Sequence, residues 1–462
     1  MKLERLLLSG ACAGLLSACA GSLPTPTTLP ETQVPAAFEQ GAPANSPIWP
    51  ATDWWRTFGS IELDQLIAST QSENLNVVAA EARVLQADAR VRQSGAALFP
   101  TIGLGADVRK LTNSEAFGVS LGASYEFDFW GKNRDMLQAS QAASRATRAD
   151  RETVALTATA GTATTYFQLL SLRERLAIAH QNLETAQSVL TITEARVRDG
   201  IATQLELAQQ RGQIAAQQSA IPQLEQQETQ NRAALALLLG RPPEGFDVAA
   251  VTLDAIALPA IAAGLPSELL VRRPDIVAAE AALESAHANV AAARAAFFPT
   301  ISLTGSGGLA SAALTGLISN PVTSFSLALS VAQTIFDAGR LSAQSDEAKA
   351  REQELIAAYR NSAITAFSEV ETSLAAIAHL AEQETYQAEQ VAQSELAFNI
   401  AEVRYREGVA DFLSVLDAQR TLYSARDQLG QLRLARLQAI VALYRALGGG
   451  WTDPNPTNVV QK

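Results

Sequence analysis

The feature that most constrains this chain of 462 residues is a stretch that it contains twice. In residues 91–104 and again in residues 290–303, an alanine-rich run ends at a Phe-Pro step and continues with apolar residues at alternate positions. Proline lacks an amide proton and disfavours helical geometry in the residue before it, so a helix should end at Pro100 and at Pro299, with a strand after each. Two long copies of one unit predict a fold of two equivalent halves.

The repeat continues toward the C-terminus. Gly131 corresponds to Gly339, and Gly200 corresponds to Gly408, each 208 positions further on. At the Phe-Pro steps the offset is 199, so the second copy holds nine additional residues, between about residues 305 and 321. These residues are expected to lengthen the second of two hairpins.

Each copy also contains one very long helical stretch. Lys132–Arg198 and Arg340–Arg406 contain no proline, and Gly161 is the one interior glycine. At ~1.5 Å per residue each helix reaches about 100 Å, so it needs partners along its sides. Apolar and small residues spread over more than one face without a sustained heptad, which fits a helix packed on neighbours at both sides. A glycine turn closes each helix, and return helices are expected over residues 203–239 and 411–447. Stacked end to end with helices expected over residues 75–98 and 274–297, the return helices nearly match the long helices in length, which favours an elongated cylinder of helices.

Strand patterns occupy the segments between these helices. Residues 117–129 alternate strictly between apolar and small or polar side chains, and residues 325–331 repeat the pattern more weakly. Such alternation predicts strands with one apolar face, and their length suits strands that cross a bilayer at a tilt. A soluble sheet packed on helices is the alternative, but two equivalent hairpins, together with the lipid anchor predicted below from the N-terminus, favour the membrane.

Four strands leave two open edges, and lipid cannot satisfy the free backbone groups of an edge. Several copies must therefore close the sheet. Two copies would give eight strands around an interior filled by side chains, whereas three would give twelve around an aqueous channel. The sequence thus favours a cyclic trimer.

The N-terminus has the features of a targeting signal. Lys2 and Arg5 precede an apolar run that is too short to span a bilayer and that ends Leu16-Ser17-Ala18-Cys19. This ending is similar to a bacterial lipobox, which predicts removal of residues 1–18 and an N-palmitoyl, S-diacylglyceryl Cys19. An ordinary signal peptide with a chance cysteine is the alternative. Cys12 would leave with the signal, so no disulfide is expected. Residues 19–59 should form a lipidated tether whose aromatic residues pack on the fold: Trp49, Trp54, Trp55 and Phe58.

The motifs that can be compared with known families are the lipobox, both Phe-Pro steps, Leu269-Leu270-Val271-Arg272-Arg273-Pro274-Asp275-Ile276, Phe336-Asp337-Ala338-Gly339-Arg340 and Leu416-Asp417-Ala418-Gln419-Arg420. Together they resemble the outer membrane efflux protein family, the TolC-like channels, and in particular its NodT-type lipoproteins. The resemblance implies an α+β membrane protein: a trimeric 12-stranded outer-membrane β-barrel, four strands per protomer, continued by a long periplasmic α-helical barrel. It also implies an exit duct that docks to a periplasmic adaptor and an inner-membrane transporter of the resistance-nodulation-division type.

The resemblance also implies functional residues where the motifs match. Two turns look like tips that meet the adaptor: Arg198, Asp199 and Gly200, and Arg406, Glu407 and Gly408. Leu413, Asp417 and Arg420 look like a constriction that keeps the tube shut. Gln209 and Gly212 stand where the first copy would need the two charges, so a charged latch comes from the second copy alone. The alternative for Asp417 and Arg420 is a solvated ion pair on the helix surface.

The expected organisation is therefore a signal (1–18), a tether (19–59), a first repeat (60–240), a connector (241–272), a second repeat (273–448) and a C-terminal tail (449–462). The net charge of −12 argues against nucleic acid. An enzyme is disfavoured because His180, His287 and His379 stand alone in the sequence, and no cofactor is expected apart from the covalent lipid. The remaining alternative is a periplasmic lipoprotein that acts as a coiled-coil scaffold or adaptor without a pore.

Overall fold

The structure is a computed structural model, and it describes residues 34–35, 37–39, 49–111, 114–259 and 266–453. The expected signal, the expected lipidation site Cys19, most of the expected tether and most of the C-terminal tail lie outside these residues. Two units make up the described chain. One includes residues 89–143 and 282–360, and the other includes residues 33–88, 144–281 and 361–462.

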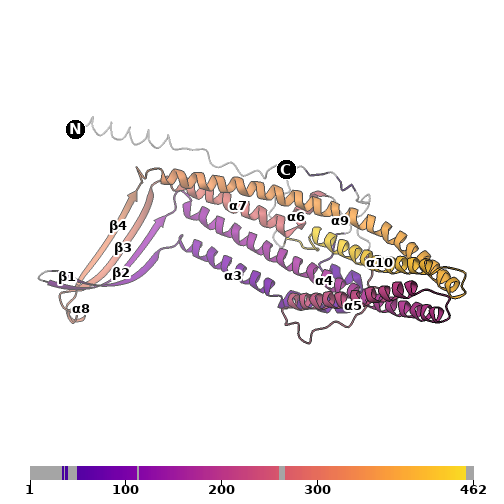
Figure 1. Cartoon of the computed structure of the whole chain (residues 1–462). Helices are drawn as coiled ribbons and strands as arrows, with labels where there is room; N and C mark the ends of the chain where they lie inside the picture. The colour runs from indigo at the N-terminus through magenta and orange to yellow at the C-terminus, as the bar shows by residue number, and fades with distance from the viewer. Residues whose placement is uncertain (1–33, 36, 40–48, 112–113, 260–265, 454–462) are drawn as a thin grey trace. The chain divides into compact units, whose positions relative to one another are not determined.

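The first unit contains an antiparallel sheet with the strand order β1-β2-β3-β4 (Figure 1). The strands are β1 (Thr101–Leu111), β2 (Ser114–Phe127), β3 (Thr300–Ser311) and β4 (Val322–Ala332). The ladder between β2 and β3 joins the two copies of the repeat, so β1 and β4 are the outer strands. As predicted, the second hairpin is the longer one, and its connection contains the short helix α8 (Gly316–Ser319).

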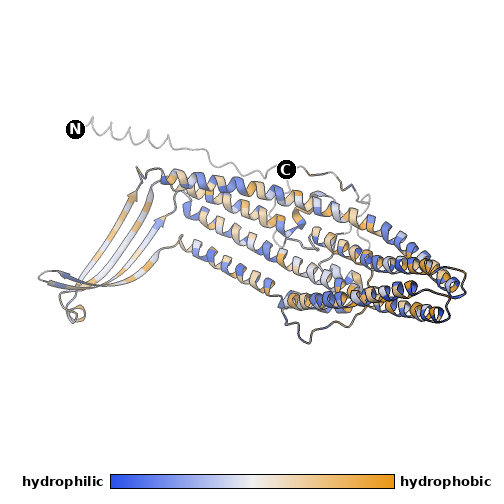
Figure 2. Ribbon diagram, viewed as in Figure 1, coloured by the Kyte–Doolittle hydropathy of each residue, from blue (hydrophilic) through white to orange (hydrophobic). Residues whose placement is uncertain are grey.

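One face of this sheet is apolar and the other is small and polar. Leu104 lies opposite Leu121 in one row, whereas Ser302 lies opposite Ser330 in a row of the other face, with 2.7 Å between their hydroxyl oxygens. The strands accordingly show alternating orange and pale bands in Figure 2. Phe117, Tyr125, Phe127, Ile301 and Leu303 on the apolar face are half-buried. Other large apolar side chains of this face are exposed in the described chain, among them Ile102, Leu104, Val108, Leu121, Phe325, Leu327, Leu329 and Val331. The predicted alternation is confirmed in both copies.

The remaining elements are η1 (Trp54–Phe58), α2 (Ile61–Glu73), α3 (Leu75–Ala96), α4 (Lys132–Arg198), α5 (Gln204–Leu238), α6 (Pro266–Arg272), α7 (Pro274–Ala295), α9 (Arg340–Arg406) and α10 (Phe412–Ala446). The two predicted helices of 67 residues are confirmed, and so are the two return helices, which have 35 residues each. α5 continues through Pro222 instead of ending there. Within the described residues, no helix is both long enough and apolar enough to cross a bilayer.

Aromatic residues at the end of the expected tether anchor it in the core of the second unit. The Trp54 ring stacks on Tyr444, with 4.8 Å between ring centroids, and Phe58 meets the edge of Phe167 at 4.9 Å. Trp54 and Phe58 are 1% and 0% exposed. Trp49 lies under the guanidinium of Arg272 at 4.5 Å. The packing role predicted for these residues is therefore confirmed.

Arg273, at the start of the second repeat, is a buried cation that ties three elements together. Its guanidinium pairs with Asp275 at 2.6 Å and Glu369 at 2.7 Å, and it donates to the carbonyl oxygen of Ala446 at 3.1 Å. Burial alone would lower the pKa of Arg273, but the hydrogen bonds and charges of the two carboxylates outweigh burial and raise it. The Arg-Pro-Asp motif thus fixes the start of α7 against α9 and the end of α10.

Candidate functional site

Each long helix ends in a tight turn built around one glycine. We call residues 198–202 the first tip and residues 406–410 the second tip. Gly200 and Gly408 both have φ of 75°, a conformation that disfavours any side chain. In the first tip the amide of Ile201 donates to the carbonyl of Arg196 at 2.9 Å, and the second tip repeats this bond. These bonds satisfy the last carbonyls of α4 and α9 and allow the chain to reverse direction.

The residues predicted to meet an adaptor are exposed at these two tips. They are Arg198, Asp199, Gly200, Arg406, Glu407 and Gly408. The Arg406 guanidinium pairs with Glu402 one turn earlier on α9, at 2.5 Å. Both tips therefore present charged side chains on a rigid turn. Their role in docking remains a prediction.

A contact between the ends of α4 and α9, just before the two tips, was not predicted from the sequence. Arg196 donates to the carbonyl oxygen of Tyr405 at 2.7 Å, and its guanidinium lies 4.6 Å from the centre of the Tyr405 ring. The Tyr405 hydroxyl donates to Glu206 on α5 at 3.2 Å. Burial raises the pKa of Tyr405, and the charge of Glu206 adds to the effect. The one sequence signal was a difference between the copies, because Val197 stands where the second copy has Tyr405.

The three predicted gate residues share one exposed face of α10. Leu413 is 64% exposed, and Asp417 and Arg420 follow it at helical spacing. Arg420 donates to the amide oxygen of Gln213 on α5 at 3.2 Å instead of pairing with Asp417. Within the described residues the carboxylate of Asp417 makes no ion pair. The face that was predicted therefore exists, but the solvated Asp417–Arg420 pair is not present in the described chain.

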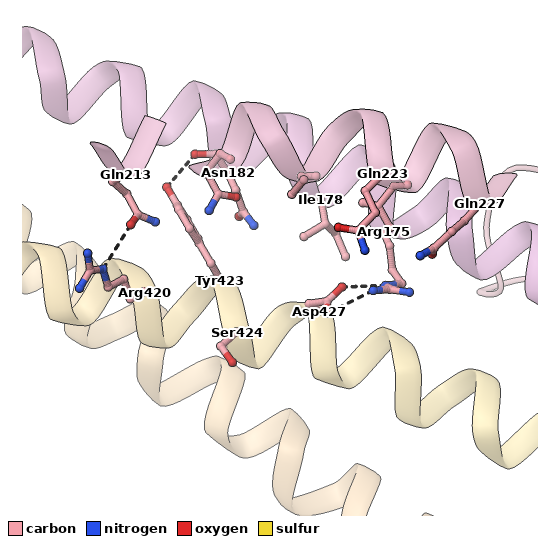
Figure 3. A pocket seen from close by; sticks show the side chains of 14 residues that line it. Arg175, Ile178, Asn182, Gln213, Gln223, Gln227, Arg420, Tyr423, Ser424 and Asp427 are labelled. Atoms are coloured by element: carbon pink, nitrogen blue, oxygen red, sulfur yellow. Dashed lines mark hydrogen bonds and ion pairs between the residues drawn. The ribbon is translucent and has the colours of Figure 1, made fainter. Parts of the chain in front are cut away.

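Arg420 also lines a polar groove that sequence reasoning did not find (Figure 3). The groove has a volume of about 390 Å³ and lies between α4, α5 and α10. On its walls Arg175 pairs with Asp427 at 2.7 Å, and the Tyr423 hydroxyl donates to the backbone oxygen of Asn182 at 2.7 Å. Burial raises the pKa of Tyr423 to about 12, so this hydroxyl stays a donor at neutral pH. The groove thus lies where α10 of the second repeat meets α4 and α5 of the first repeat.

The sequence matches the family model described as "Outer membrane efflux protein" over residues 66–241 and 265–449. The pyoverdine export outer membrane protein OpmQ of Pseudomonas putida is 42% identical to this chain, over 96% of this chain and 97% of that protein. The cation efflux system protein CusC of Escherichia coli K12 is 33% identical, over 86% of this chain and 88% of its own length.

Solved structures agree with these sequence matches. The outer-membrane channel OprN has a TM-score of 0.84 and 30% identity, over 94% of this chain and all of that chain. The open state of the MtrE outer membrane channel of Neisseria gonorrhoeae also has a TM-score of 0.84, at 31% identity, over 93% of this chain and 98% of that one. The two matched family segments coincide with the two copies of the repeat, each with its hairpin and long helix. The chain therefore belongs to the outer membrane efflux protein family.

Proposed function

We propose that three copies of this chain form the outer-membrane exit duct of a tripartite efflux system. The observation that carries the proposal is the sheet, which has an exposed apolar face, a small polar face and two outer strands. An exposed apolar face of this size belongs in lipid or against another protein. In lipid, the outer strands β1 and β4 need partners for their backbone groups, and other copies of the chain supply them.

The composition of the polar face favours three copies over two. Serine, threonine and glycine dominate this face, as in the pair formed by Ser306 and Ser326, whose hydroxyl oxygens are 2.8 Å apart. Eight strands need large side chains to fill their interior, whereas twelve leave an aqueous channel. Small polar side chains suit the wall of a channel that twelve strands enclose.

Aromatic residues support the placement of the strands in a membrane. Phe99, Phe129 and Phe336 are 70%, 65% and 88% exposed, and they lie where the strands meet the helices. Trp130 stacks on Phe298 at 4.7 Å, and its indole nitrogen donates to the carbonyl of Pro299 at 2.7 Å. Tryptophan favours the boundary between lipid and water, and girdles of aromatic residues flank the apolar band of membrane barrels. This end of the sheet would lie at the inner surface of the outer membrane.

The helices and the N-terminus complete the proposed duct. Lipid on Cys19 would anchor each protomer, and the helices would extend into the periplasm. The two tips would meet a periplasmic adaptor that links the duct to an inner-membrane transporter, which we expect to be of the resistance-nodulation-division type. Leu413, Asp417 and Arg420 would line the constriction at this end, and adaptor binding would move them apart. The duct is passive, so the transporter would choose the substrate.

Conductance and oligomeric state together test the proposal. The purified, lipidated protein should migrate as a trimer that unfolds to a monomer on heating, and it should form ion channels in planar bilayers of phospholipid. The pore-less scaffold predicts instead a protein that needs no detergent and gives no conductance. A stable dimer or monomer in detergent would contradict the trimer.

A further inference from the structure

The polar groove between α4, α5 and α10 combines an apolar floor with polar walls, as ligand sites commonly do (Figure 3). Ala179 and Leu224 lie at its base, and both are buried members of one hydrophobic cluster. Side-chain amides line its walls: Asn182, Gln213, Gln217, Gln223 and Gln227. The volume of about 390 Å³ is large enough for a small organic molecule.

Asn182 contributes a buried acceptor that no donor of the described chain reaches. Its side chain is 4% exposed, and its Oδ1 accepts no hydrogen bond within the described residues. Tyr423 approaches the same residue, but its hydroxyl donates to the backbone oxygen of Asn182. A buried acceptor without a donor destabilises the folded chain, so this oxygen needs an N–H or O–H group from outside the chain.

Arg420 contributes a positive charge that no carboxylate neutralises. Asp427 is the one carboxylate among the residues that line the groove, and Arg175 holds it through contacts of 2.7 and 3.3 Å. Arg420 donates through Nε to the neutral amide of Gln213, and it makes no ion pair in the part of the chain that the structure describes. The terminal N–H groups of its guanidinium are therefore free to bind a carboxylate, which they fit as a fork.

The acceptor and the cation lie near one end of the groove, about one helical turn apart. The hydroxyl of Tyr423 marks the level of Asn182, and Arg420 precedes Tyr423 by three residues on α10, or ~4.5 Å along the helix axis. In an N-acyl amino acid a single carbon separates the carboxylate from the amide nitrogen. Hydrogen bonds of ~2.9 Å from each of these groups extend its reach to both side chains.

We propose that this groove binds a small organic anion whose carboxylate contacts Arg420 and whose adjacent N–H donates to Oδ1 of Asn182, and that such anions pass through the proposed duct. An apolar group of the ligand covers Ala179 and Leu224. The class that fits is an N-acylated amino acid or a related carboxylate with a neighbouring N–H. The second part of the proposal rests on the proposed function, whereas the binding site does not.

Dansylglycine is a suitable probe, because it has a carboxylate, an adjacent sulfonamide N–H and a ring whose fluorescence rises when it leaves water. It should bind saturably to the purified full-length protein in detergent, and an excess of N-acetylphenylalanine should displace it. Dansylglycinamide, which lacks the charge, should bind about tenfold more weakly. Equal binding of the two probes, or no saturable binding above that of detergent alone, would overturn the site.

Matched variants locate the probe in the groove. Arg420→Gln removes the charge and Asn182→Leu removes the acceptor, and each should weaken binding of dansylglycine about tenfold. Arg420→Lys, which keeps the charge without the fork, should retain part of the affinity. Arg211→Gln removes an exposed arginine that pairs with Glu194 outside the groove, and it should leave the affinity unchanged. The same affinity in all four variants, or the same loss in all four, would contradict the site.

Single-channel recording tests passage through the duct. Millimolar dansylglycine should interrupt the current through the wild-type protein in planar bilayers, and it should not interrupt the current through Asn182→Leu. Uninterrupted current through a protein that binds the probe would place the groove outside the conducting path and overturn the second part of the proposal. Binding of the probe by a protein that forms no channels would instead count against the proposed function.

Discussion

At the scale of single residues, charged side chains join parts of the chain that are far apart in the sequence. Arg175 pairs with Asp427, which is 252 residues away, and Arg196 donates to the backbone oxygen of Tyr405, which is 209 residues away. His287, which stands alone in the sequence, has Glu352 at 2.9 Å. Such pairs depend on which helices lie side by side, and helical periodicity alone does not determine that.

Asp128 illustrates a residue whose role depends on charge. Its carboxylate accepts from the backbone amides of Asn133 and Arg134 at 2.9 and 3.0 Å, where α4 begins. Burial alone would raise the pKa of Asp128, but these amides and the Arg134 side chain outweigh burial and lower it. The Asp128 carboxylate therefore stabilises the folded chain at a pH above about 3.9, the pKa of aspartate in the unfolded chain. This stabilisation is lost as the pH falls through the lower pKa that Asp128 has in the folded chain.

Asp128→Ala should accordingly lower the free energy of unfolding by about 1–2 kcal/mol at neutral pH. The difference from the wild type should disappear at a pH below the folded-state pKa. Thermal unfolding in detergent, followed by circular dichroism across this range, measures both effects. Asp128→Asn, which keeps one acceptor without the charge, should lie between the two proteins. A loss that does not change with pH would show that the charge plays no part.

At the scale of elements, length and composition were enough to predict every long helix and both hairpins. The absence of proline from residues 132–198 and 340–406, together with a glycine after each stretch, determined their limits. Strict alternation predicted the strands. The groove between α4, α5 and α10 could not be predicted, because it arises where helices from different repeats meet.

The exposed face of α10 leads to a prediction about the gate. Leu413→Ala combined with Asp417→Ala removes an exposed apolar side chain and a free carboxylate from the proposed constriction. Single-channel conductance in planar bilayers should rise, because the narrowest part of the duct becomes wider. Leu205→Ala combined with Gln209→Ala makes the equivalent change in the first repeat and should have a smaller effect. Unchanged conductance in the first variant would remove the gate assignment.

At the scale of the whole molecule, the repeat explains how one gene product supplies two different hairpins. Both halves follow the same plan, but α10 carries tyrosine, arginine and aspartate where α5 has alanine, glycine and serine. Comparing the two halves of the sequence reveals this difference between α5 and α10. The structure adds its consequence, because the polar side chains of α10 bind α4.

Attachment to the membrane after removal of the lipid distinguishes a protein whose strands span the bilayer from one that only its lipid holds there. Replacing the signal and Cys19 with an ordinary signal peptide and a serine should leave the protein in the membrane after an alkaline wash, because the strands themselves cross the bilayer. A lipid-anchored scaffold treated in the same way would be released. Release of this variant would therefore contradict a transmembrane sheet, and mass spectrometry of the parent protein would check the lipid itself.

The outer strands of the sheet also bear on how the cell must handle newly made chains. Before it assembles with other copies, a newly made chain has unpaired backbone groups on β1 and β4 next to a large exposed apolar surface. Such edges readily join the wrong partner and aggregate. A newly made chain should therefore need protection from aggregation until it assembles, and overproduction of the chain should lead to aggregates in the periplasm.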